Sequence, residues 1–198
     1  MNPEQKGKFI VLYGPNNLGK TSQAKMLAET LEEQGIKTMT IKYPVYDLKP
    51  TGHKLNAVLR EGLQMPEIEV QKLYAQNRRD FEPTLRNHLT SGAWVVAEDY
   101  TGTGIAWGLV RGVSLEALEA MNKGLRQEDL AILLHGERFL NNIEEGHRNE
   151  VDDEIWSRAQ EMHLFLAKRY GWRKVYATRS KEAVHQDILA IICEQYKL

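Results

Sequence analysis

One stretch decides the fold: Phe9-Ile10-Val11-Leu12-Tyr13-Gly14-Pro15-Asn16-Asn17-Leu18-Gly19-Lys20-Thr21-Ser22. Its first five residues form an apolar run, which is typical of a strand buried on both faces. From Gly14 to Thr21 it matches G-x-x-x-x-G-K-[ST], the pattern of a loop that binds phosphate groups. The helix expected after the loop carries apolar residues on one side: Ala24, Leu27, Ala28 and Leu31. The order of strand, loop and helix favours true phosphate binding over a chance match in an ordinary glycine turn.

Each fixed position in this loop has a physical role. The glycines allow backbone angles that turn successive N–H groups toward a phosphate. The helix that starts at Lys20 points the positive end of its dipole at the same anion, and the Lys20 ammonium can reach the β- and γ-phosphates. The Thr21 hydroxyl can ligate Mg²⁺. We therefore expect ATP to bind at Gly14, Asn16, Asn17, Leu18, Gly19, Lys20, Thr21 and Ser22.

Four further apolar segments are expected to be strands, with helical patterns between them. Short strands that alternate with helices predict a parallel sheet covered on both faces. We expect an α/β fold, a three-layer α/β/α sandwich with a five-stranded parallel sheet, in a single domain over residues 1–198. Pro83 is expected to kink or restart its helix, and residues 101–127 are expected to be glycine-rich first and helical afterwards. The expected strands are 9–13, 38–43, 94–97, 130–134 and 174–177, and the expected helices begin at Lys20 or cover 50–62, 66–89, 155–170 and 181–196.

The composition limits the possible partners and compartment. Lys and Arg together number 26 against 27 Asp and Glu, so the formal net charge is −1. A chain this neutral has no bulk electrostatic attraction to nucleic acid or to a membrane surface. The single cysteine, Cys193, excludes an intramolecular disulfide, which suits a reducing cytoplasm. No apolar run approaches the roughly 20 residues that span a bilayer. We expect a cytoplasmic protein that acts on small molecules.

Two carboxylates, Glu98 and Asp99, follow the third apolar segment. In open parallel sheets, ligands gather beyond the carboxyl ends of the strands, so both side chains are expected near the phosphates. One of them could hold a Mg²⁺-bound water or orient an acceptor hydroxyl. Two solvated loop acids are the alternative, and the phosphate loop favours the functional interpretation.

Beyond these landmarks, the sequence resembles the thymidylate kinases over nearly its whole length. The resemblance implies the P-loop kinase fold, with Mg²⁺ as cofactor and transfer of the ATP γ-phosphate to dTMP, giving dTDP. It also implies a homodimer. It rests on segments in the family's order: Gly19-Lys20-Thr21-Ser22-Gln23, Lys42-Tyr43-Pro44, Gly52-His53-Lys54-Leu55, Leu73-Tyr74-Ala75-Gln76-Asn77-Arg78, Val96-Ala97-Glu98-Asp99-Tyr100 and Asp129-Leu130.

The resemblance also implies roles for single residues on the acceptor side. Tyr74 would stack on the thymine, and Arg78 would hydrogen-bond the edge of the base. The four-residue spacing projects both side chains to one side of a helix; a core aromatic and a solvated edge residue are the alternative. Trp107 would help to wall the base pocket. The implied substrate-binding residues are Lys42, Tyr43, Pro44, Tyr74, Arg78, Asp99, Tyr100 and Trp107.

For the transfer itself, the resemblance implies Lys20, Glu98 and Arg148 as catalytic residues. Glu98 would take the place of the family's Mg²⁺-associated aspartate and would join Thr21 at the metal. Residues 137–153 would form a mobile lid over ATP. Arg148 would contact the transferring phosphate, and Arg138 is a second candidate; for both, a surface charge is the alternative.

The departures from the family pattern concern the acceptor. Asn16 stands where the family's phosphate loop has an acidic residue. Asp99 stands where the family has an arginine that binds the acceptor's phosphate. The family also has an arginine near the position of Tyr46, and this chain lacks it. Lys42 stands where arginine is usual, and lysine cannot form the two parallel hydrogen bonds that arginine donates to a phosphate. Asp99 beside a dianionic phosphate would weaken binding unless a cation lies between them. Compensation could come from one of four cations: Lys49, Lys54, Arg60 or Arg111.

These departures keep two other functions open. A deoxynucleoside kinase would suit Glu98 and Asp99 beside an unphosphorylated 5′-hydroxyl, but the segment from Tyr74 to Arg78 resembles the monophosphate kinases. A nucleotide-binding protein without catalysis would explain an altered acceptor site. The intact Lys20 and Thr21 argue against that second alternative.

Overall fold

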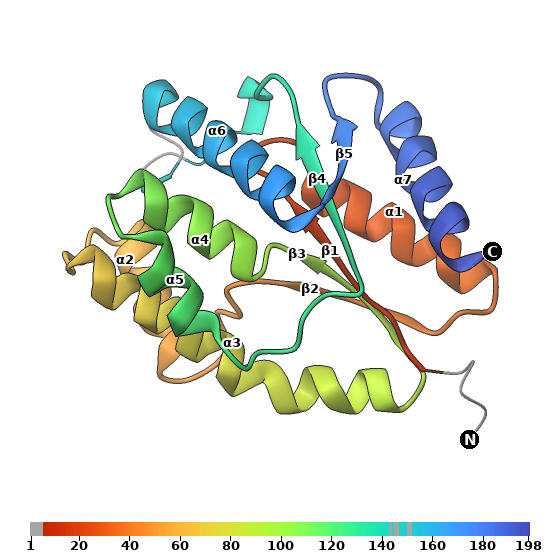
Figure 1. The fold of residues 1–198 in the computed structure, drawn as a ribbon, viewed down its shortest axis with the longest axis horizontal. Helices are drawn as coiled ribbons and strands as arrows, with labels where there is room; N and C mark the ends of the chain where they lie inside the picture. Colours follow the sequence, from red (N-terminus) through yellow and green to blue (C-terminus); the bar gives the residue numbers. More distant parts are fainter. Residues whose placement is uncertain (1–5, 143, 145–146, 150–151) are drawn as a thin grey trace.

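Five parallel strands form one sheet at the centre of the molecule (Figure 1), in the order β2-β3-β1-β4-β5. The structure is a computed structural model, and it describes residues 6–142, 144, 147–149 and 152–198. The predicted five-stranded parallel sheet is confirmed. The strands are β1 (Phe9–Tyr13), β2 (Thr38–Lys42), β3 (Trp94–Glu98), β4 (Leu130–His135) and β5 (Arg173–Tyr176).

Helices cover both faces of this sheet, which gives the predicted three layers (Figure 1). One face is covered by α1 (Lys20–Glu33) and α7 (Lys181–Tyr196). The other face carries α3 (Glu67–Thr90), α4 (Thr101–Val110), α5 (Leu115–Asn122) and α6 (Asp153–Tyr170), and α2 (Thr51–Arg60) packs against α3. A short 3-10 helix, η2 (Leu140–Asn142), follows β4. No helix among the described residues has both the length and the apolar character needed to cross a membrane.

The central strand shows why the sequence folds in this way. Phe9, Val11 and Tyr13 point into the core beneath α3–α6, whereas Ile10 and Leu12 point into the core beneath α1 and α7. All five side chains are completely buried. A strand between two helix layers has no solvent face, so its sequence is apolar at every position and does not alternate.

Two helical segments bear on the sequence prediction: α3 matches the predicted helix 66–89 without a restart at Pro83, whereas the start of α4 differs from the prediction. Pro83 does not restart α3, which continues over 24 residues because Leu85 and Leu89, beyond the proline, are still buried in the core. The glycine-rich segment is already helical from Thr101. Its glycines serve close packing: a Cβ on Gly102 would lie 2.3 Å from the ring of Trp172. Intimate contact, and not loop structure, therefore explains the small residues in α4.

Candidate active site

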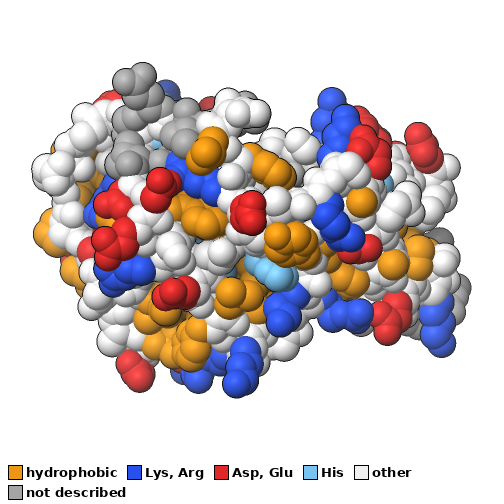
Figure 2. All heavy atoms as spheres, turned by 90° about the horizontal axis from the view of Figure 1, so that it is seen from above, with side chains coloured by type: hydrophobic (Ala, Val, Ile, Leu, Met, Phe, Trp, Pro, Cys, Tyr) orange, Lys and Arg blue, Asp and Glu red, His pale blue; other side chains and the backbone are white. Residues whose placement is uncertain are grey.

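The carboxyl ends of β1, β2 and β3 open into a cavity of about 470 Å³. The loop after β1 forms one wall, and α2, α3, α4 and the segment after β4 form the others. All residues predicted to bind ATP or the acceptor line this cavity except Gly14, and the predicted catalytic residue Arg148 does not line it. On the upper face of the molecule, basic and acidic side chains are intermingled (Figure 2).

The loop between β1 and α1 has the backbone that the motif predicts. Asn17 and Gly19 both have left-handed φ values, 62° and 78°, which glycine adopts freely and asparagine tolerates better than most residues. Lys20 is 4 % exposed, and its Nζ donates hydrogen bonds to the carbonyl oxygens of Gly14 at 2.8 Å and Pro15 at 2.9 Å. The ammonium group is therefore held against the loop at the end of α1. The buried side chain of Leu18 packs into the core, which leaves only its backbone facing the cavity.

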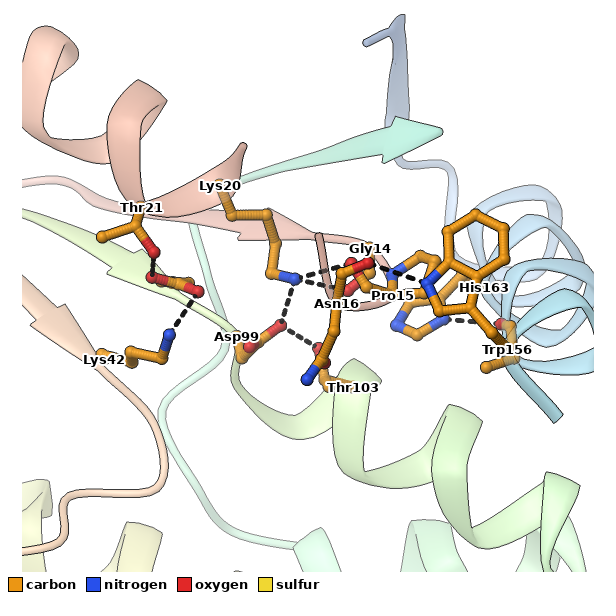
Figure 3. A network of polar contacts seen from close by, with 12 residues as sticks. Gly14, Pro15, Asn16, Lys20, Thr21, Lys42, Asp99, Thr103, Trp156 and His163 are labelled. Carbon is orange, nitrogen blue, oxygen red and sulfur yellow. Dashed lines mark hydrogen bonds and ion pairs between the residues drawn. The ribbon is translucent and has the colours of Figure 1, made fainter. Parts of the chain in front are cut away.

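Strand register brings the charged groups together beside this loop. Glu98 pairs in register with Leu12 on one side and with Lys42 on the other. Lys42 Nζ lies 2.9 Å from Glu98 Oε1, and the Thr21 hydroxyl donates to Glu98 Oε2 at 2.6 Å. Thr21 and Lys42 thus converge on the same carboxylate from opposite sides (Figure 3).

Asp99 lies one residue beyond the strand and has a left-handed φ of 63°. Its Oδ1 accepts a hydrogen bond from the Thr103 hydroxyl at 2.7 Å and lies 3.7 Å from Lys20 Nζ (Figure 3). Lys20 therefore points toward both the loop carbonyls and Asp99.

The two adjacent carboxylates have opposite proton affinities. Burial acts to raise the pKa of Glu98, but the ammonium groups of Lys20 and Lys42 outweigh it and hold that pKa below its usual value. Burial raises the pKa of Asp99, and the negative charge of Glu98 adds to this effect, so the attraction of Lys20 does not compensate. Glu98 is the carboxylate that stays ionised, and Asp99 is the one that accepts a proton more readily.

The neighbouring oxygens of Thr21 and Glu98 fit a magnesium ion. Mg²⁺ prefers hard oxygen ligands and usually takes only one or two from the protein, with water and substrate phosphates completing its octahedron. The described residues contain no cluster of three or more His, Cys, Asp or Glu side chains that could enclose a metal. This donor set therefore suits a metal that arrives with a nucleotide.

Aromatic residues bound the opposite side of the cavity. Tyr74, on α3, is half-buried and lines the cavity. Trp107 lines it too, but is 5 % exposed. Tyr43 and Tyr100 are buried against each other with ring centroids 5.0 Å apart. Tyr43 and Tyr100 are mainly core residues that support the wall of the cavity.

Arg78 also lines the cavity, and its Nε, Nη1 and Nη2 each donate one hydrogen bond to the protein. Nη2 donates to Asn122 Oδ1 at 2.8 Å, and Nη1 donates to the Tyr100 carbonyl at 3.3 Å. Complete burial lowers the pKa of Arg78 to about 10. The guanidinium is thus fixed beside the cavity by neutral acceptors.

Comparison with known proteins identifies relatives of the chain. The family model for thymidylate kinase matches residues 12–188. The chain belongs to the thymidylate kinase family. The thymidylate kinase of Nitrosospira multiformis is 29 % identical over 205 residues, which cover 96 % of this chain and 99 % of that one. The human thymidylate kinase is 27 % identical over 189 residues, covering 93 % and 89 %.

A solved structure agrees with the fold. The thymidylate kinase of Candida albicans superposes with a TM-score of 0.82 at 19 % identity, covering 96 % of this chain and 94 % of that one. The resemblance and the fold class predicted from the sequence are confirmed.

The two arginines of the predicted lid are both paired with carboxylates of the protein. Arg148 lies outside the cavity, where its Nη2 donates to Glu67 Oε2 at 2.8 Å. Arg138 forms an ion pair with Asp153 at 2.7 Å. Residues 143, 145–146 and 150–151 of the predicted lid lie outside the described residues. Contact of either arginine with a transferring phosphate stays a prediction.

Three residues near this thymidylate kinase site were not assigned a role from sequence, and two of them, Asn77 and Trp156, bond to its loops. The side chain of Asn77 holds the segment after β2, because its Oδ1 accepts from the Val45 N–H at 2.8 Å and its Nδ2 donates to the Val45 carbonyl at 2.9 Å. Trp156, on α6, donates from Nε1 to the Asn16 carbonyl at 2.8 Å. His163, also on α6, lies near the loop (Figure 3) and forms a hydrogen bond with the Ala159 carbonyl at 2.7 Å, and burial lowers its pKa to about 3.

Only Asn77 gave a signal in the sequence, as a polar residue within an apolar stripe. Trp156 and His163 look like ordinary core residues on a helix. Their importance comes from where α6 lies in the fold, which local spacing does not reveal.

Proposed function

We propose that this chain transfers the γ-phosphate of ATP to dTMP, giving ADP and dTDP. The observation that carries the proposal is the convergence of Lys20, Thr21 and Glu98 in one cavity with the aromatic side chain of Tyr74. Membership of the thymidylate kinase family supports a monophosphate acceptor over a nucleoside. A single domain over residues 1–198 would perform the reaction, with residues 137–153 as its lid.

On the donor side, the loop from Gly14 to Thr21 would hold the triphosphate of ATP. Its backbone and the start of α1 supply partial positive charge, and Lys20 supplies a full one. Thr21 and Glu98 would hold Mg²⁺, which when bound supplies positive charge to the β- and γ-phosphate oxygens. Lys42 beside Glu98 would steady that carboxylate in its ionised form.

On the acceptor side, Tyr74 would stack on the thymine ring, and Arg78 would present its guanidinium edge to the base. Arg78 is already immobilised by Asn122 and Tyr100, so little side-chain entropy would be lost on binding. Tyr43, Pro44, Tyr100 and Trp107 would shape the pocket through packing.

Transfer would then proceed by attack of a dTMP phosphate oxygen on the γ-phosphorus. The bond between that phosphorus and the β–γ bridging oxygen breaks, and ADP leaves with the bridging oxygen. No covalent bond to the protein is required, because positioning and charge stabilisation carry phosphoryl transfer. Closure of the lid would exclude water, whose attack is the competing reaction. Arg148 would have to leave Glu67 to reach the transferring group.

An acceptor panel tests this proposal directly. Purified protein with Mg-ATP is supplied separately with dTMP, thymidine, and other nucleosides and monophosphates, and nucleotide products are separated by chromatography. We expect dTDP from dTMP. Phosphorylation of thymidine alone would replace the proposal with a deoxynucleoside kinase. Nucleotide binding without any turnover would replace it with a binding protein that lacks catalysis.

We also propose that the protein works as a cytoplasmic homodimer. Family membership supports the dimer, and the single cysteine suits a reducing compartment. Sedimentation equilibrium of the purified chain tests the dimer, since a monomer mass across the working concentration range would contradict it.

A further inference from the structure

The end of α2 places a guanidinium group in the wall of the cavity. Arg60 lies over the ring of Tyr46, with 4.6 Å between its Cζ and the ring centroid. Both side chains line the same cavity as Lys42 and Tyr74. Stacking on an aromatic ring holds the plane of an arginine while its N–H edge stays available to an anion.

The edge of Arg60 already binds an anionic group in this structure. Its Nε donates to Glu144 Oε1 at 2.6 Å and its Nη2 donates to Glu144 Oε2 at 3.2 Å. This two-point geometry is the one by which arginine also binds phosphate. Glu144 lies in the segment 137–153 after β4, whereas Arg60 lies on a helix, so the pair joins two separate parts of the cavity wall.

An acceptor phosphate needs such a cation, and the other cations of the cavity have partners of their own, with Arg179 and Lys181 paired with Asp187 and Glu182 after β5. Lys20 is bonded to loop carbonyls and faces Asp99, and Lys42 is paired with Glu98. Arg78 is bonded to Asn122 and Tyr100. Glu98 and Asp99 themselves bring negative charge to the cavity, which would repel a second anion. Arg60 has as its partner a carboxylate that a phosphate can replace.

We propose that Arg60 binds the phosphate group of the acceptor monophosphate, and that Glu144 occupies this site until the acceptor arrives. The inference rests on the proposed function, because it requires a monophosphate acceptor, and it assigns the residue that recognises the phosphate. A dianionic phosphate outcompetes a monoanionic carboxylate for the same guanidinium edge.

The test compares binding of dTMP with binding of thymidine, measured by calorimetry without ATP or Mg²⁺. Arg60→Ala should weaken dTMP binding by about 10- to 100-fold and leave thymidine binding within about twofold. Arg60→Lys should fall between wild type and Arg60→Ala, because a lysine keeps the charge and loses the fork. Glu144→Gln should tighten dTMP binding several-fold. Lys72→Ala, which removes an exposed cation from the neighbouring helix α3, is the control and should change neither ligand.

The outcomes separate this inference from the proposed function. If Arg60→Ala weakens dTMP and thymidine equally, or weakens neither, Arg60 does not recognise the phosphate, although wild-type turnover of dTMP would still support the kinase. If the wild-type protein binds and phosphorylates no thymidine nucleotide, the proposed function is wrong and the role of Arg60 falls with it. Thermal melting of each variant against wild type excludes unfolding as the cause.

Discussion

The two halves of the cavity are built in different ways. On the donor side, Lys20 and Thr21 begin α1 just after β1, and Glu98 ends the neighbouring strand β3, so the register of β1 with β3 brings them together. On the acceptor side, Arg60 and Glu144 are 84 positions apart in the chain and meet through a helix end and a loop. Register makes the donor side recognisable as a motif. The acceptor side depends on tertiary arrangement, so it is free to change its phosphate contacts while the fold stays the same.

The largest expected effect is at Lys20, the charge at the centre of the donor side. Lys20→Ala should lower the rate of dTDP formation by about 1000-fold or more, since a preorganised charge on the transferring phosphate is lost. The measurement is the initial rate of dTDP formation at saturating Mg-ATP and dTMP. Lys25→Ala is the matched control, because Lys25 is on the same helix with its side chain 79 % exposed. Wild-type turnover in Lys20→Ala would show that the donor side does not depend on this charge.

The next largest effect is expected at Glu98, the carboxylate that Lys20 and Lys42 keep ionised. Glu98→Gln should lower kcat by about 100-fold, and the loss should be greatest at low Mg²⁺ concentration. Glu128→Gln is the control, because Glu128 is also partly buried and accepts a hydroxyl hydrogen bond, from Tyr13 at 3.0 Å, away from the cavity. A rate for Glu98→Gln that equals the Glu128→Gln rate at every Mg²⁺ concentration would contradict a metal role.

The lowered pKa of Glu98 also predicts where kcat begins to fall as the pH is lowered. A carboxylate whose folded pKa lies below its usual value stays ionised as pH falls through the ordinary glutamate range, about 4.3. Loss of kcat at acid pH, corrected for unfolding, should therefore begin below that range. An apparent pKa at or above it would mean that the lysines do not control this carboxylate.

The same contrast explains how much the sequence revealed. The apolar run at Phe9–Tyr13 and the glycine–lysine spacing after it reflect backbone requirements that few other residues satisfy, so the sheet and the donor loop were predictable. The helix around Pro83 was predictable as one stretch, and it does not restart there because burial of the residues beyond the proline outweighs one lost helical hydrogen bond. Arg60 was only one of four candidate cations, since sequence spacing does not show which cation faces the cavity and which faces solvent.

A smaller effect is expected at Asp99, where the two halves meet. Asp99→Asn should tighten dTMP binding by about three- to tenfold at neutral pH, because a like charge near the acceptor phosphate is removed. Asparagine also tolerates the left-handed φ of 63° at this position. Calorimetric titration with dTMP measures the change, with thymidine as the ligand that should be indifferent to it. Weaker dTMP binding in Asp99→Asn would show that Asp99 assists the acceptor.

The tighter dTMP binding of Asp99→Asn should depend on pH, because the pKa of Asp99 is raised. As pH falls through that pKa, the wild-type carboxyl takes up a proton and loses the charge that repels the phosphate. The ratio of the two dissociation constants, wild type to Asp99→Asn, should therefore fall toward one at acid pH. Ionisation of dTMP itself is shared by both proteins and cancels in the ratio, so a ratio that rises toward acid pH would contradict the assignment.

The smallest effect concerns Trp156, which extends the donor side beyond its motif. Trp156→Phe removes the hydrogen bond to the Asn16 carbonyl and should raise the KM for ATP by about two- to fivefold, the usual net value of one such bond. Trp94→Phe is the matched control, because the two indoles are 7 % and 8 % exposed and lose similar packing. If only Trp156→Phe changes the KM for ATP, the phosphate loop depends on α6 for its shape. If both variants change it equally, core packing alone is responsible, and the donor side is complete within its motif.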